Sequence, residues 1–238
     1  MGAQNRYKGN FQSTDSIIEL YGVSTVYAGE KRPAIKDITF SIEKGEYVLI
    51  SGPNGAGKTT LLETILGLLK PRSGKIKLLG YEIPRRALEA RKLCSYVPQD
   101  FIRSPDEVFK AKEVVAMGIA SNRPLGKLRR DDWRRVEEVL ELLGISDLAE
   151  RPIGKLSGGQ QQKVFIARAL VRDPRVLFLD EPFSALDSKS RIFLSDLLEE
   201  LHKEDKTILL VAHAPPELKS IDREIYMVEG KIEKVIVH

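Results

Sequence analysis

The sequence predicts an α/β fold with a mainly parallel sheet, an N-terminal antiparallel β-subdomain and a helical subdomain. In the second half of the chain, apolar strand patterns alternate with helical patterns, which is typical of a parallel sheet with helices on both faces. Near the start, half-buried strand patterns follow one another without helices between them. Between about residues 100 and 155, apolar positions recur at three- and four-residue spacing, which favours helices.

Composition is that of a globular chain with a sizeable core. Its 238 residues are 42% hydrophobic and 30% charged, and no run approaches the roughly 18 apolar residues of a membrane span. The start lacks the pattern of a secretory signal, so we expect no secretion. The single cysteine, Cys94, cannot form an internal disulfide and is expected to be buried. Charges of both signs are interleaved along most of the chain, so the net charge of +4 is weak evidence for nucleic acid, which is not expected as a partner.

The first third of the chain reads as strands and turns around one helix. Residues 1–16 are polar and aperiodic, so we interpret them as a tail, with one domain over 17–238. A turn at 29–33 and another at 43–46 separate the first strand patterns, and glycine or proline ends most later ones. The expected strands here are 17–21, 23–27, 34–42, 47–50, 75–80 and 93–97, with helices beginning at 61 and at 84.

The remaining elements form the helical subdomain and the rest of the sheet. Helical patterns cover 108–117, 131–143 and 147–150, within the subdomain at about 100–155. After them come helices at 158–172 and 188–203, strands at 175–179 and 207–212, and a hairpin of 224–229 with 231–237.

One glycine-rich stretch between a strand and a helix predicts a phosphate site. Glycines allow the backbone to turn tightly and to present N–H groups to a phosphate. Lys58 supplies a positive charge for the β- and γ-phosphates, and Thr59 a hydroxyl for Mg²⁺. This pattern is a P-loop, and it predicts a P-loop NTPase core within the α/β fold. The residues expected to bind ATP and Mg²⁺ are Gly52, Pro53, Asn54, Gly55, Ala56, Gly57, Lys58, Thr59 and Thr60.

Two acids end the apolar strand at 176–179. Asp180 is placed to hold Mg²⁺ or its waters, which is the role of a Walker B carboxylate beside a P-loop. Glu181 would then orient or deprotonate the water that attacks the γ-phosphate. With a P-loop in the same chain, this interpretation is preferred to two solvated acids at a strand end.

A second anion site is predicted where the segment 156–163 begins a helix. Ser157 stands at the N-cap, and the two glycines that follow leave the first N–H groups of the helix open. The residues predicted to bind nucleotide here are Ser157, Gly158, Gly159 and Gln160.

Together these motifs resemble the ABC ATPases, the nucleotide-binding subunits of ABC transporters, over about residues 17–236. The LSGGQ segment at 156–160 is highly specific to that family. The resemblance implies that Gln99 reaches toward Mg²⁺ and the attacking water, and that His213 contacts the γ-phosphate. It also implies that Asp187 meets the partner subunit near its P-loop, and that Tyr27 stacks on adenine, with Tyr21 as the competing candidate.

The resemblance further implies partners and a location. A second copy of the chain would close LSGGQ over the ATP held by the first copy's P-loop. Integral membrane permease subunits would be driven from the cytoplasmic face of the cell membrane, with a substrate-binding protein indirectly involved. The stretches at 111–118, 131–133 and 142–145 resemble ATPases of metal and metal-chelate importers.

Two alternatives remain at this stage. One is a non-transport ABC ATPase that acts on nucleic acid or the ribosome, which the basic pI of about 9.0 supports and the lack of a heptad insertion opposes. The other is a subunit that binds ATP without hydrolysis, which Lys58, Asp180, Glu181 and His213 argue against.

Overall fold

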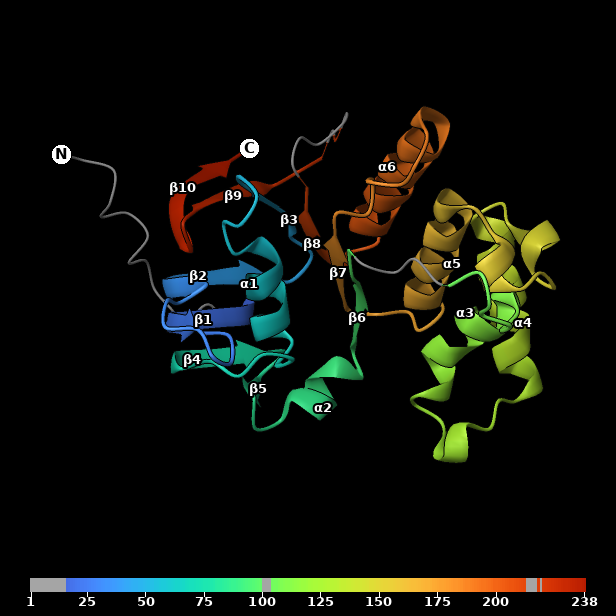
Figure 1. The fold of residues 1–238 in the computed structure, drawn as a ribbon, viewed down its shortest axis with the longest axis horizontal. Coiled ribbons are helices and arrows are strands. Elements are labelled where there is room, and N and C mark those ends of the chain that lie inside the picture. Colours follow the sequence, from blue (N-terminus) through green and yellow to red (C-terminus); the bar gives the residue numbers. More distant parts are fainter. Residues whose placement is uncertain (1–15, 100–103, 213–217, 219) are drawn as a thin grey trace.

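The computed structural model describes residues 16–99, 104–212, 218 and 220–238, and contains two sheets. The larger has the strand order β10-β9-β3-β8-β7-β6, and the smaller has the order β2-β1-β4-β5. Helix α1 lies between the two sheets, and α5 and α6 lie on the opposite side of the larger one (Figure 1). The expected α/β architecture with an antiparallel N-terminal sheet is confirmed.

Four neighbouring strands of the larger sheet, from β3 to β6 at its edge, run parallel. They are β3 (Tyr47–Ser51), β6 (Cys94–Val97), β7 (Val176–Asp180) and β8 (Thr207–Val211). The strand β9 (Arg223–Val228) runs parallel to β3, and β10 (Lys231–Val237) pairs antiparallel with β9 as the expected hairpin. The carboxyl ends of β3, β8, β7 and β6 therefore lie on the same side of the sheet.

The two faces of this sheet bury separate cores. Along β3, Tyr47 and Leu49 pack into the core on the side of α5 and α6, whereas Val48 and Ile50 pack into the core shared with α1 (Lys58–Ile65) and the smaller sheet. The alternation follows from the period of two in a strand. Because both faces are covered, β3, β7 and β8 are buried along their whole length.

The smaller sheet differs from the expectation in two respects. The patterns at 17–21 and 23–27 belong to a single strand, β1 (Ser16–Thr25), whose pairing with β2 (Ile35–Glu43) shifts register around Gly22. At Gly22 φ is +59°, and the irregular backbone there interrupts the alternation of apolar and polar residues. The prediction therefore divided one strand into two. A short strand missed by the prediction, β5 (Tyr81–Ile83), pairs with β4 (Ser73–Leu78).

Helices make up the predicted helical subdomain and its connection to the sheet. The subdomain contains α3 (Ala111–Ala120) and α4 (Arg130–Leu142), with short 3₁₀ turns η1 (Pro124–Gly126), η2 (Ser146–Leu148) and η3 (Ile153–Lys155). Helix α5 (Gly158–Leu170) packs on α3, α6 (Ser188–Lys203) follows β7, and α2 (Ala87–Arg91) precedes β6. The helix expected at 147–150 is only the 3₁₀ turn η2. Within the described residues, no helix is long and apolar enough to cross a membrane.

Candidate nucleotide site

The P-loop connects buried β3 to α1 through three glycines with positive φ. At Gly52, φ is +136° and a Cβ would lie 2.1 Å from the carbonyl oxygen of Met227. At Gly57, the N-cap of α1, φ is +95° and a Cβ would lie 2.5 Å from the carbonyl oxygen of Ala34. Only glycine fits either position. The first turn of α1 contains no acidic residue, so the positive end of its dipole is free to attract an anion.

Lys58 is held inside this loop by backbone carbonyls. Its ammonium donates to the carbonyl oxygens of Gly52 at 2.9 Å and Pro53 at 3.1 Å, and the residue is only 5% exposed. Burial lowers the pKa of Lys58, while the charges of Glu181 and Asp180 oppose this shift. The structure thus brings the P-loop cation and the two acids at the end of β7 together, as predicted.

Asp180 ends β7 as a fully buried carboxylate. Neither oxygen has a hydrogen bond of normal geometry from the described residues, although the hydroxyls of Thr59 and Tyr96 interact with it and favour its charged form. Burial, the largest effect, raises the pKa of Asp180. A buried carboxylate with free oxygens beside a threonine hydroxyl is a donor set that suits a hard cation such as Mg²⁺.

Glu181 and Gln99 meet from neighbouring parallel strands. The Gln99 side-chain amide, just after β6, donates to the Glu181 carboxylate at 3.2 Å. Glu181 has φ of +50° and its backbone N–H donates to the carbonyl of Val211 in β8 at 2.9 Å, which fixes where the side chain leaves the sheet. The fourth predicted residue of this edge, His213, lies outside the described residues.

Of the two aromatic candidates, Tyr27 lies against the P-loop. Its hydroxyl is 2.9 Å from that of Thr60, and 40% of the residue is exposed. The hydroxyl of Tyr21 instead donates to Glu19 at 2.7 Å, on the smaller sheet. This geometry favours Tyr27 for contact with a base held at the P-loop.

The signature segment forms the predicted cap of α5. Ser157 Oγ accepts from the N–H of Gln160 at 3.4 Å, and Gln160 Oε1 accepts from the N–H of Ser157 at 3.0 Å, which is a capping box. Gly158 and Gly159 lie beside Ala185, so the segment adjoins the loop that leads to Asp187. Asp187 is exposed and caps α6 by accepting from the N–H of Ser190 at 2.8 Å.

The signature and the P-loop lie apart within one chain. Helices α1 and α5, which each of them begins, are on opposite sides of the larger sheet (Figure 1). No hydrogen bond between 157–160 and 52–60 occurs among the residues that the structure describes.

The sequence prediction missed three residues around the acids. Burial and the nearby charge of Asp180 raise the pKa of Glu63 in α1, and the pKa of Tyr96 in β6 is raised by burial and by the same charge. Gln162, fully buried in α5, donates its amide to the carbonyl of Pro182, which links the signature helix to the loop after Glu181. A polar residue on an otherwise apolar helix face was the only sequence signal for Gln162.

Known proteins resemble this chain over most of its length. The profile of the family described as "ABC transporter" matches residues 35–184. The manganese transport system ATP-binding protein MntB of Halalkalibacterium halodurans is 37% identical over 217 residues, which span 91% of this chain and 84% of MntB. The molybdate/tungstate import ATP-binding protein WtpC of Thermococcus kodakarensis is 42% identical over 92% of this chain and 64% of WtpC.

A solved structure extends the likeness to three dimensions. The dimeric ATP-binding cassette MJ0796, in a post-hydrolysis state bound to ADP and Pi, superposes with a TM-score of 0.83 and 30% identity, over 92% of this chain and 98% of that one. The family profile match and the structural likeness together show that the chain belongs to the ABC transporter family, as an ATP-binding cassette.

Proposed function

We propose that this chain binds and hydrolyses ATP to power import through separate membrane subunits. The observation that carries the proposal is the convergence of Lys58, Asp180 and the Gln99–Glu181 pair beyond the carboxyl ends of the parallel strands β3, β7 and β6 of one sheet. A loop that only bound phosphate would not need Asp180, Glu181 and Gln99 opposite it.

Binding begins at the P-loop. Backbone N–H groups of 52–60 and the start of α1 cradle the phosphates, while the Lys58 ammonium exchanges its carbonyl partners for phosphate oxygens. Tyr27 stacks on the adenine. Thr59, Gln99 and Asp180 would hold Mg²⁺, which would neutralise negative charge on the phosphates.

Hydrolysis depends on Glu181. Its carboxylate accepts a proton from the attacking water or orients that water, a contribution of about 10²–10⁴-fold for such a group. Gln99 holds the carboxylate through the 3.2 Å bond and links it to the start of the helical subdomain. His213 remains a predicted contact of the γ-phosphate.

The complete site needs two copies of the chain. Ser157, Gly158, Gly159 and Gln160 of one copy cover the ATP on the P-loop of the other, and Asp187 lies at the same interface. Exposure of Ser157 and its distance from its own P-loop support this arrangement, as does the dimeric MJ0796. Loss of the γ-phosphate weakens the shared contacts and lets the dimer open.

The cargo is proposed from relatives alone, because a cassette does not touch it. MntB belongs to a manganese transport system, so a metal ion is the first proposal, while WtpC serves molybdate and tungstate. We propose that the chain acts at the cytoplasmic face of the membrane on integral permease subunits, with a substrate-binding protein contributing indirectly.

Glu181→Gln tests the catalytic proposal. The variant keeps the shape of the site but removes the base, so we expect ATP turnover to fall at least about 10²-fold while an ATP-bound dimer accumulates. ATPase rates and light scattering with ATP measure the two effects. The matched control is Glu233→Gln, at an exposed position of β10, which should leave both unchanged. Normal turnover by Glu181→Gln would refute the role.

A further inference from the structure

The connection between α3 and α4, together with the first residues of α4, carries an excess of positive charge. Residues 121–135 contain six basic and two acidic side chains, a net charge of +4, which equals the formal net charge of all 238 residues. The connection forms the end of the helical subdomain that projects away from both sheets (Figure 1).

Internal contacts use only part of this charge. Asp132, 4% exposed, pairs with Arg123, and Asp131 pairs with Arg134 at 3.2 Å. Arg135 donates to the carbonyl of Val171 at 2.9 Å. The remaining cations, Lys127, Arg129 and Arg130, are exposed and have no ion pair within the described part of the chain, although Arg129 lies near the charge of Asp132.

Large apolar side chains accompany these cations. Leu125, in η1, is 91% exposed, and Trp133, in the first turn of α4, is 36% exposed. Farther along α4 the charge reverses, with exposed Glu137, Glu138 and Glu141. The segment 121–135, which we name the basic tip, therefore carries exposed apolar side chains among an excess of cations, with Asp131 paired to Arg134 and the glutamates of α4 set back from it.

We infer that the basic tip binds the anionic lipid headgroups of the membrane beside which the transporter works. Near an anionic leaflet, Lys and Arg each strengthen binding about fivefold, so three free cations suffice for weak binding that assembly with a permease reinforces. A projecting leucine fits the acyl boundary of a bilayer. Nucleic acid would use the cations and leave Leu125 in water, so a lipid surface is favoured.

This inference rests on the proposed function only for the presence of a bilayer, and its test does not use ATP. Trp133 is the sole tryptophan of the chain, so its fluorescence reports directly on the basic tip. With vesicles of phosphatidylglycerol and phosphatidylcholine we expect a blue shift, quenching by brominated acyl chains, and reversal at high salt. Phosphatidylcholine alone should produce none of these.

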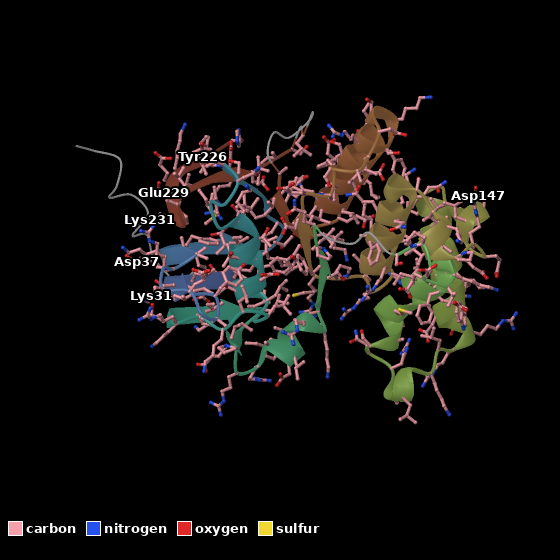
Figure 2. All side chains as sticks on the ribbon, in the orientation of Figure 1. Lys31, Asp37, Asp147, Tyr226, Glu229 and Lys231 are labelled. Atoms are coloured by element: carbon pink, nitrogen blue, oxygen red, sulfur yellow. The ribbon has the colours of Figure 1, made fainter. Side chains whose placement is uncertain are left out.

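Charge reversal separates the basic tip from the rest of the surface. Lys127→Glu combined with Arg130→Glu should weaken vesicle binding by at least about thirtyfold, since two favourable contacts of roughly 1 kcal/mol are lost. Leu125→Gln should reduce acyl-chain quenching. The matched control, Lys31→Glu with Lys231→Glu, makes the same charge change at exposed positions on the other side of the molecule (Figure 2), and should bind nearly as wild type.

Three outcomes would overturn the inference. They are equal binding to both kinds of vesicle, equal weakening by the control pair, and a Trp133 shift produced equally by soluble polyglutamate or single-stranded DNA. The ATPase activity of the same variants, measured without lipid, distinguishes a failure of this inference from a failure of the proposed function. Normal ATPase activity without lipid binding refutes this inference and leaves the proposed function standing.

Discussion

Backbone hydrogen bonds join the β9–β10 turn to the P-loop and to the residues beside it. Gly230 donates its N–H to the carbonyl of Ala56 at 3.0 Å and accepts from the N–H of Lys36 at 2.7 Å. A Cβ at Gly230 would lie 2.6 Å from the carbonyl oxygen of Ala34, the same atom that closely approaches Gly57. Glu229 and Lys231, which flank the glycine, lie beside the smaller sheet (Figure 2). We therefore predict that Gly230→Ala displaces the P-loop.

Gly80→Ala is the matched control. Gly80 and Gly230 both lie in hairpin turns, with φ of +78° and +76°, but a Cβ at Gly80 would meet nothing within 4 Å. The left-handed conformation costs an alanine about 1–2 kcal/mol at either position. Only at Gly230 does overpacking add about 1–3 kcal/mol. Since the unfolded states change alike, the difference between the variants isolates the contact with Ala34.

Urea unfolding and ATP titration measure the two consequences. We expect Gly230→Ala to lose about 1–3 kcal/mol more unfolding free energy than Gly80→Ala, and only Gly230→Ala to bind ATP more weakly. Equal losses of stability, with unchanged ATP affinity in both variants, would refute the reasoning that the turn supports the loop.

Two further predictions concern buried ionisable groups. Burial raises the pKa of Asp180, so ionisation of this carboxyl opposes folding; Asp180→Asn, which has no charge to bury, should raise the unfolding free energy of the nucleotide-free chain yet abolish ATPase activity, and a destabilised variant would contradict this. Burial raises the pKa of Cys94 to about 12 from its ordinary 9.0, so the unfolded chain ionises first and stability falls as pH rises from 9 to 12. In urea unfolding at several pH values, Cys94→Ala should reduce that slope by up to about 1.4 kcal/mol per pH unit; an unchanged slope would contradict it.

Local chemistry explains how much of the site could be predicted. The glycines of the P-loop and the acids at the end of β7 each follow a continuous run of apolar strand residues, and the carboxyl ends of parallel strands meet. The bounds of α6 match the prediction at 188–203, because Asp187 caps its start and the apolar period is regular.

What the sequence could not predict depends on contacts between distant segments. The support of Ala56 by Gly230 joins residues far apart in the chain, and the choice between Tyr27 and Tyr21 depends on which one the fold places beside Thr60. Gln162 is one of three adjacent glutamines, and only the packing of α5 shows that its amide reaches Pro182. The missed strand β5 is three residues long, too short for a periodic pattern.

Mixed dimers test most directly the central proposal that each ATP site is shared by two copies. Lys58→Ala disables the P-loop and Ser157→Ala disables the signature, so either variant alone has two damaged sites per dimer. A mixed dimer combines the intact P-loop of the Ser157→Ala copy with the intact signature of the Lys58→Ala copy. We predict that mixing two inactive variants restores part of the ATPase activity. A mixture as inactive as each variant alone would contradict a site shared between copies.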